Sequence, residues 1–207
     1  MRVAHLRARL ADQGAKPGHI EALLRSWAHA RPLEGFEPAQ APPKAVRGAL
    51  PGLTFELQSL ACVRAEHPSE DGSSRRLVAF ADGQTVESVL LPRGGVCVST
   101  QIGCAVGCTF CMTGQGGLLR QLGSAEIVAQ VVLARQRQAV KKVVFMGMGE
   151  PAHNLDNVLE AIELLGTAGG IGHKNLVFST VGDRRAFERL PRGRVKPALA
   201  LSLHSTK

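Results

Sequence analysis

The spacing of hydrophobic residues follows three successive patterns along the chain, and each pattern predicts a different kind of structure. Near the amino terminus, apolar residues recur at helical spacing at Leu6 and Leu10, and again over residues 20–27. Residues 14–18 between them contain Gly and Pro in the arrangement of a turn. We therefore predict two short helices, which form a helical module over residues 1–33.

Residues 34–90 pass from a linker-like composition to the alternation of β-strands. Residues 34–52 are rich in Pro, Ala and Gly, which predicts an irregular segment. An Asp-Gly pair at residues 82–83 separates two apolar runs, which is a strong hairpin signal. We predict a small antiparallel sheet, with strands at Leu53–Leu57, Ala61–Ala65, Arg76–Phe80 and Thr85–Leu91.

Residues 91–207 alternate strands with helices, which is typical of parallel βαβ units. Ser124 is a candidate N-cap for the first of these helices. The predicted strands are Val96–Ile102, Lys142–Met146, Asn175–Thr180 and Pro197–Leu203, and the predicted helices are Ser124–Gln138, Asn154–Leu165 and Asp183–Leu190. A parallel sheet is normally buried on both faces, so we expect an α/β fold whose four-stranded barrel is incomplete at its carboxyl end.

The composition indicates a soluble, basic protein. The 207 residues include 25 Lys and Arg against 17 Asp and Glu, a formal net charge of +8 that favours a nucleic acid as partner. Aromatic residues make up only 4% of the chain, which argues against single-stranded bases stacked on rows of aromatic rings. The basic helical module fits either an RNA-binding role or a plain helical hairpin with a solvated charged face. The chain has no run of about 20 apolar residues and no secretory signal, so we expect a cytoplasmic protein with reduced thiols and no membrane contact.

Three cysteines within eight residues are the strongest chemical signal. Cys104, Cys108 and Cys111 can converge on one metal centre, and three ligands leave a fourth position open. A structural zinc site needs four ligands, and no further Cys or His follows at a suitable spacing. Disulfides are disfavoured because the three residues are so close and the total of five cysteines is odd. For Cys62 and Cys97 the default role is that of small hydrophobic residues.

Glycines and polar residues follow the other predicted parallel strands, where α/β proteins bind ligands. These segments are residues 147–151, 179–182 and 202–204. Glycines at 147 and 149 allow the backbone to approach a ligand, and Glu150 can accept hydrogen bonds from an ammonium or hydroxyl group. Each segment alone also fits a turn, a cap or a structural His. Together they predict a pocket at the strand ends.

The spacing Cys-x₃-Cys-x₂-Cys, with Phe110 before the last Cys, resembles the signature of the radical S-adenosylmethionine (radical SAM) superfamily. The longer stretch from Cys97 to Gly114 resembles the radical SAM adenine methyltransferases of the RlmN/Cfr family. The segments around Glu150, Ser179 and residues 202–204 match further motifs of that family in the right order. The resemblance extends from Glu87 to His204. It implies that residues 91–207 form a partial radical SAM (β/α) barrel, with four of about six strands.

The resemblance also implies an activity. The family methylates carbon 2 or carbon 8 of an adenosine in RNA, with carbon 2 the expected target here; the substrate is usually 23S rRNA and in some members tRNA. This carbon carries no acidic proton, so the family uses radical chemistry. The implied cofactors are a [4Fe-4S] cluster and S-adenosylmethionine. The implied partners are the RNA and an electron donor such as flavodoxin or a ferredoxin-type protein, acting on a monomer.

The family roles transfer to matching positions of this sequence. Cys104, Cys108 and Cys111 would hold the cluster, Glu87 would accept a proton, and Cys97 would resolve a protein–RNA crosslink through a transient disulfide. The residues expected to contact S-adenosylmethionine are Gly149, Glu150, Ser179, Ser202, Leu203 and His204.

The sequence departs from the family pattern at one point. The family carries the methyl group on a second cysteine near the carboxyl terminus, and no Cys follows Cys111 here. An expected Asn contact to S-adenosylmethionine also falls beyond Lys207. We therefore expect an incomplete form that does not complete methyl transfer. Two alternatives are a radical SAM enzyme with another substrate and a non-enzymatic RNA-binding remnant.

Overall fold

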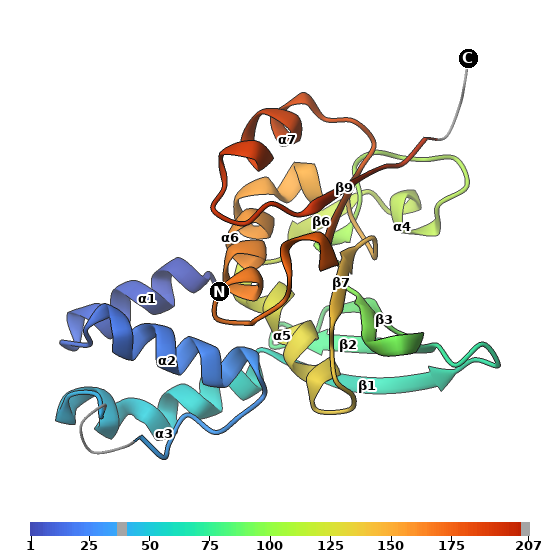
Figure 1. Ribbon diagram of the computed structural model, residues 1–207. Coiled ribbons are helices and arrows are strands. Elements are labelled where there is room, and N and C mark those ends of the chain that lie inside the picture. Colours follow the sequence, from blue (N-terminus) through green and yellow to red (C-terminus); the bar gives the residue numbers. More distant parts are fainter. Residues whose placement is uncertain (37–40, 204–207) are drawn as a thin grey trace.

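The computed structural model describes residues 1–36 and 41–203 (Figure 1). The helices are α1 (Val3–Asp12), α2 (Pro17–Ala28), α3 (Lys44–Ser59), α4 (Met112–Gln115), α5 (Ser124–Arg135), α6 (Leu155–Gly166) and α7 (Arg184–Arg189). The strands are β1 (Ala61–Pro68), β2 (Ser74–Phe80), β3 (Thr85–Leu91), β4 (Gly95–Cys97), β5 (Gln101–Gly103), β6 (Leu118–Gln121), β7 (Lys142–Phe145), β8 (Leu176–Thr180) and β9 (Ala198–Leu201). Within these residues no helix is both long and apolar enough to cross a bilayer.

Seven strands form one mixed sheet in the order β1-β2-β3-β4-β7-β8-β9. The pairs among β1, β2, β3 and β4 are antiparallel, whereas β4, β7, β8 and β9 are parallel to their neighbours. The predicted α/β class is confirmed. The antiparallel strands are not a separate sheet, however, because β3 pairs directly with β4 and continues the parallel part.

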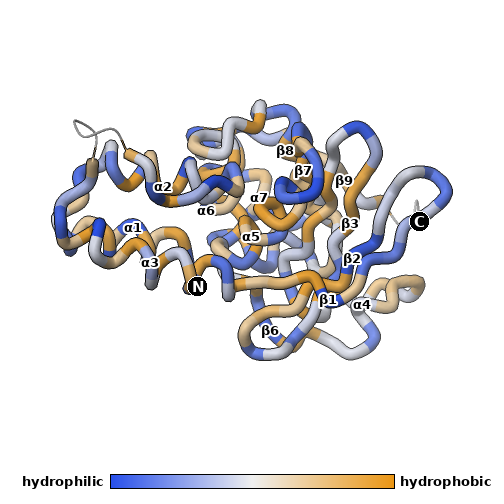
Figure 2. Tube along the Cα trace, turned by 90° about the horizontal axis from the view of Figure 1, so that it is seen from below, coloured by the Kyte–Doolittle hydropathy of each residue, from blue (hydrophilic) through white to orange (hydrophobic). Residues whose placement is uncertain are grey.

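The strand register assigns side chains to two faces of this sheet, because paired residues share a face and successive residues alternate. The helix face carries residues packed in the core against the helices: Leu90, Val96, Val143, Phe145, Leu176 and Phe178. The opposite face, called here the Cys97 face, carries Val89, Cys97, Val144, Val177 and Ser179. Figure 2 shows the hydrophobic stretches gathered where α5 and α6 meet the strands.

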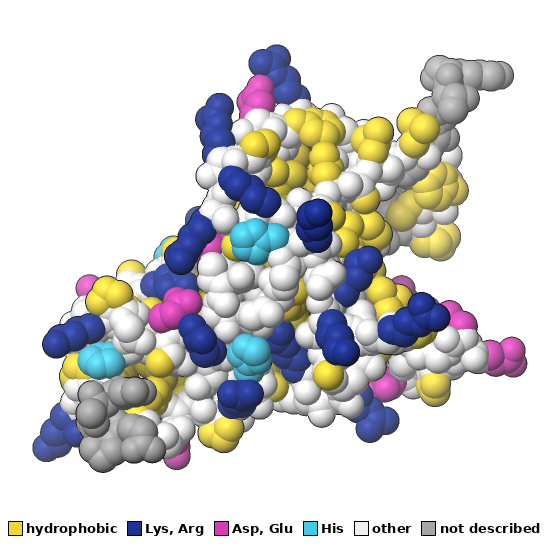
Figure 3. Space-filling model, viewed as in Figure 1, with side chains coloured by type: hydrophobic (Ala, Val, Ile, Leu, Met, Phe, Trp, Pro, Cys, Tyr) yellow, Lys and Arg dark blue, Asp and Glu magenta, His cyan; other side chains and the backbone are white. Residues whose placement is uncertain are grey.

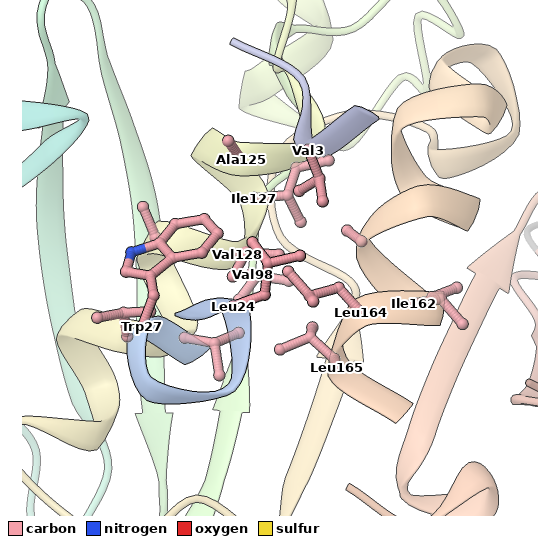
Figure 4. Packing of buried hydrophobic residues seen from close by; sticks show 14 of the residues in the cluster. Val3, Leu24, Trp27, Val98, Ala125, Ile127, Val128, Ile162, Leu164 and Leu165 are labelled. Carbon is pink, nitrogen blue, oxygen red and sulfur yellow. The ribbon is translucent and has the colours of Figure 1, made fainter. Parts of the chain in front are cut away.

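The helical module of α1 and α2 is tied to the rest of the chain at both ends. The backbone N–H of Val3 donates to the Ser124 hydroxyl (2.8 Å) at the start of α5, and the N–H of Ala4 donates to Glu160 (3.0 Å) on α6. Arg135 on α5 donates to the carbonyl of Ala28 (2.6 Å). Between these ties, side chains from α2, α5 and α6 pack together in one core (Figure 4).

Helix α3 corrects two predictions. The predicted strand Leu53–Leu57 is wrong, and the predicted irregular segment is helical from Lys44 onward. The helix forms because Val46, Leu50, Leu53 and Leu57 are buried along one side, at a spacing that fits a helix. Pro51 lies inside the helix on the exposed side, where water can reach the carbonyl that its missing N–H leaves free.

Two further predictions need correction at the start of the parallel part. The predicted strand Val96–Ile102 is two short strands, because β4 belongs to the large sheet and β5 pairs with β6 in a separate two-stranded sheet. The predicted N-cap Ser124 is the first helical residue, and Gly123 is the cap. The Glu126 carboxylate accepts the Gly123 N–H (2.7 Å), while the Ser124 hydroxyl serves the helical module instead.

We expect Gly48→Ala to raise the free energy of unfolding by about 0.5–1 kcal/mol, because Gly48 is an exposed residue of α3 with open space around it. Gly83→Ala should lower it by about 1 kcal/mol, since Gly83 has a φ of +80° in the β2–β3 turn. Urea denaturation of the two variants measures both signs. A loss of stability in Gly48→Ala would contradict the helical assignment.

Candidate active site at the ends of the parallel strands

The segments that follow β4, β7 and β8 meet at one end of the sheet. The carboxyl ends of adjacent parallel strands lie at the same edge, so the loops after them are neighbours. The β4 and β7 loops are directly joined: the N–H of Thr100 donates to the carbonyl of Met148 (2.8 Å), and the N–H of Met148 donates to the Ser99 hydroxyl (2.8 Å). The predicted site residues on these loops are therefore close to one another in space.

The cysteine loop lies between β5 and α4. Its start is fixed by a hydrogen bond from the N–H of Cys104 to the carbonyl of Gly117 (3.0 Å), and its end by one from Cys111 to the carbonyl of Cys108 (3.0 Å). All three thiols are free and half-buried. Gly107 has a φ of +68°, a backbone conformation that favours glycine.

The loop fits an iron–sulfur cluster by its donors, since three free thiols are the ligands that such clusters use. Across residues 1–36 and 41–203, no group of three or more His, Cys, Asp or Glu side chains is arranged to hold a single metal ion. The cysteines of an iron–sulfur cluster bind different iron atoms, so they need not converge on one point as the ligands of a single ion do.

Glu150 joins the ends of β7 and β8. It is only 5% exposed, and its two carboxylate oxygens accept the N–H groups of Ala152 (3.0 Å) and Val181 (3.1 Å). Its own N–H donates to the side chain of Gln101 (2.7 Å). Each carboxylate oxygen has a second lone pair, so the side chain can still accept a ligand N–H. Its first role in this structure is to position the strand ends.

Gly149 must be glycine in this arrangement. Its φ is +97°, and a Cβ atom there would lie 2.5 Å from the Cβ of Gln101. Gly147 is equally restricted, because a Cβ would lie 2.6 Å from the Ser99 hydroxyl. The two glycines allow the β7 loop to lie directly against the segment that follows β4.

Of the residues near the ends of β8 and β9 that were predicted to contact S-adenosylmethionine, two lie next to each other. The hydroxyls of Ser179, which is buried, and Ser202, which is half-buried, are 3.0 Å apart. Leu203 points its side chain largely into solvent, at 68% exposed. His204 lies outside the described residues, so its predicted role remains a prediction.

Glu87 and Cys97 lie on the same face of two adjacent strands. Cys97 is paired with Val89, two residues from Glu87, so the two side chains are diagonal neighbours at a typical distance of about 7–8 Å. Burial raises the pKa of the Cys97 thiol to about 11, so the thiol is protonated at neutral pH. Glu87 is exposed and forms an ion pair with Arg75 (2.8 Å).

A buried polar segment supports the site and was missed in the sequence. Ser99, Thr100 and Gln101 are at most 1% exposed, although they follow an apolar strand. Gln130 on α5 pairs with Ser99 through both the N–H and the carbonyl (2.9 Å each), and Asn154 donates to the carbonyls of Thr100 and Leu122 (2.7 Å each). The sequence signal for this segment was a run of three polar residues between two hydrophobic ones. In an ordinary strand such a run would leave at least one side chain exposed to solvent, but here all three side chains are buried.

Comparison with known proteins identifies the family of this site. The family model of the Radical SAM superfamily matches residues 98–207, which contain the cysteine loop and the ends of β7, β8 and β9. A crystal structure of a radical SAM methyltransferase from Sphaerobacter thermophilus matches with a TM-score of 0.78 and 34% identity. The match covers 99% of this chain and 62% of that one.

Curated relatives match over the full length of this chain. A probable RNA methyltransferase from Methylibium petroleiphilum is 74% identical over 208 residues, and one from Pseudomonas aeruginosa is 68% identical over 211 residues. This chain covers 59% and 61% of those two proteins, so it spans about 60% of their length. The predicted family resemblance is confirmed.

We expect Asn154→Ala to lower the free energy of unfolding by about 2 kcal/mol, because it leaves the buried carbonyl of Leu122 without its donor. The matched control is Asn175→Ala, at an exposed position, which should change stability by less than about 0.5 kcal/mol. Urea denaturation followed by circular dichroism measures both. Equal effects of the two substitutions on stability would contradict the stabilising role of the Asn154 hydrogen bonds in the buried polar segment.

We expect Cys97 to react slowly with iodoacetamide, because only the thiolate reacts and a pKa of about 11 leaves about one thiolate in a thousand at pH 8. The exposed Cys62 should be alkylated at least about tenfold faster in the folded chain. Mass spectrometry of peptides at successive times gives both rates. Between pH 8 and pH 10 the rate at Cys97 should rise about tenfold per pH unit. A Cys97 rate that is the same in folded and urea-unfolded chain would contradict the burial effect.

Proposed function

This chain belongs to the radical SAM superfamily, and we propose that it carries the cluster-binding and cofactor-binding part of an RNA adenine methyltransferase. The observation that carries this proposal is the juxtaposition at the strand ends. The loop with three free thiols follows β5, and the first residue of β5, Gln101, accepts the N–H of Glu150 in the glycine-rich β7 loop that Glu150 ties to β8. In the whole enzyme, β4, β7, β8 and β9 would be part of a (β/α) barrel completed by further strands.

The proposed substrate is an adenosine of 23S rRNA, methylated at carbon 2, with tRNA as a second substrate. The names of the relatives as probable RNA methyltransferases support an RNA substrate. The net charge of +8 supports it independently, because a basic surface attracts phosphate groups. Figure 3 shows Lys and Arg side chains spread over one face of the molecule, from the helical module to α7.

Cys104, Cys108 and Cys111 would hold a [4Fe-4S] cluster, and the ends of β7, β8 and β9 would bind S-adenosylmethionine. When bound, the cluster and S-adenosylmethionine supply the radical chemistry that an unactivated aromatic carbon requires. Gly149 allows the backbone to approach the cofactor, and Glu150 holds that backbone in place. The hydroxyls of Ser179 and Ser202 form a pair that can reorient toward a ligand.

In this proposal, two residues on the Cys97 face, Cys97 and Glu87, each take part in a proton transfer during the reaction. Cys97 would act as the resolving thiol, which must lose its proton before it attacks a sulfur atom. Its raised pKa keeps it protonated until a base is available. Glu87, on the same face of the sheet, would separately serve as the proton acceptor of the methylation reaction. No disulfide is present in this structure, where all five cysteines are described and free.

Exposed hydrophobic side chains surround the proposed site. They are found beside the cysteine loop and at the ends of β8 and β9, at Phe110, Met112, Leu119, Val181, Leu201 and Leu203. An exposed apolar patch of this kind normally marks a surface that another molecule or segment covers. We propose that the RNA and the additional length of the whole enzyme cover it. An electron donor of the flavodoxin or ferredoxin type would approach a monomer in the cytoplasm.

We expect the chain, reconstituted with iron and sulfide without oxygen, to bind iron and absorb visible light. The triple substitution of Cys104, Cys108 and Cys111 by Ala should remove nearly all of the bound iron. Cys62→Ala is the matched control, because Cys62 lies on β1, away from the loop, and should leave the iron content unchanged. Iron retained by the triple variant, or zinc found in its place in the unmodified chain, would contradict the proposal.

Activity can be followed in the same preparation. With a reductant, the reconstituted chain should cleave S-adenosylmethionine to 5′-deoxyadenosine, and the triple variant should not. RNA should remain unmethylated, because no Cys after Cys111 is present to carry the methyl group. Mass spectrometry of digested RNA tests this second point. Methylated adenosine would show that the proposed division of roles is wrong.

A further inference from the structure

A cavity of about 670 Å³ lies away from the proposed active site, between α2, α3, β1 and α5. Its wall is mixed: the apolar side chains Trp27, Leu33, Leu57 and Val132 stand beside charged and polar ones. In Figure 4 the Trp27 ring lies at the edge of the packed core, beside α5. The volume is within the range of about 300–1,000 Å³ that is usual for small-molecule sites.

One buried cation lines this cavity. Arg76 on β2 is 7% exposed, and its Nη1 donates to the carbonyl of Leu133 (3.1 Å) on α5. Its Nε makes no hydrogen bond but forms an ion pair with the Glu66 carboxylate (3.5 Å). Because this N–H has no acceptor at hydrogen-bond distance, an anionic oxygen of a ligand could accept a hydrogen bond from it.

The charges at the cavity limit the ligand to a small net charge. Arg31, which is exposed, adds a second positive charge, while Glu34 in the wall and Glu66 beside Arg76 each add a negative one. A ligand with several negative charges would be repelled by Glu34 and Glu66, and a neutral one would leave the Arg76 Nε without a hydrogen bond. The apolar side chains of the wall favour a ligand whose remaining part is hydrophobic.

We propose that this cavity binds a small amphiphilic anion, with one carboxylate or phosphate group at Arg76 and an apolar body against Trp27, Leu57 and Val132. The site is separate from the proposed active site. Arg75 pairs with Val89 on the Cys97 face, whereas Arg76 contacts α5 on the helix face, because successive residues of a strand point to opposite faces. The proposal does not depend on the function proposed above.

Trp27 gives a direct measurement of binding, because the chain has one Trp and no Tyr. The probes are octanoate, octyl phosphate and, as the neutral counterpart, octanol. We expect octanoate or octyl phosphate to change the Trp27 emission saturably, with an affinity about tenfold or more above that of octanol. Comparison of the two anions shows which head group the site accepts.

Arg76→Gln should reduce the affinity for the anion to that for octanol. The matched control is Arg75→Gln, which removes the same charge one residue away on the opposite face and should leave the affinity within about twofold. Should Arg76→Gln fail to fold, as judged by circular dichroism, Arg31→Gln at the exposed edge should weaken anion binding by severalfold and leave octanol binding unchanged.

Three results would overturn the proposal. The first is the absence of any saturable change in Trp27 emission with either anion. The second is equal affinity for octanoate, octyl phosphate and octanol in the unmodified chain. The third is equal loss of affinity in Arg75→Gln and Arg76→Gln, which would indicate a general effect of charge.

Discussion

The structure depends on how the polar groups after β4 are satisfied. Ser99, Thr100 and Gln101 carry three pairs of backbone groups into the interior, where each unpaired group would be costly. Gln130, Asn154 and the backbone of Met148 provide most of the partners. The chain can therefore leave the sheet at Cys97 and enter β5 without exposing its backbone. The cysteine loop starts from this fixed position.

The same hydrogen bonds define the region where a cofactor would bind. Gln101 accepts the N–H of Glu150, and Glu150 accepts the N–H of Val181, so the start of β5 is linked to the loop after β7 and that loop to the loop after β8. Each link is buried or half-buried, which makes it stronger than the same bond in water. The cysteine loop, in contrast, is held by backbone hydrogen bonds, from Cys104 to Gly117 and from Cys111 to Cys108. The strand ends are thus joined by buried side chains, whereas the cysteine loop is joined to the chain through its own backbone.

Much of this organisation could be predicted from the sequence, and the failures have identifiable physical causes. The parallel strands β7 and β8 and the helices after them were predicted to within a few residues, since their periodicity and boundaries agree. Helix α3 was missed because Gly48, Pro51 and Gly52 lower local helix propensity, while burial of one side outweighs that penalty. The segment at residues 98–100 was read as strand because its enclosure depends on partners such as Gln130 and Asn154, which are distant in sequence.

The site residues illustrate the same limit. The cysteine spacing identified candidate ligands, yet spacing alone could not indicate that Glu150 has both carboxylate oxygens engaged within the chain. The sequence also could not show that the two faces of β2 have different surroundings. Arg75 and Arg76 are adjacent and chemically identical, but register places one beside Glu87 and the other beside Leu133. Their different surroundings come from the pairing of β2 with β1 and β3 and from the position of α5. A side chain's role here is decided by the face it occupies, and that is fixed only when the whole sheet has formed.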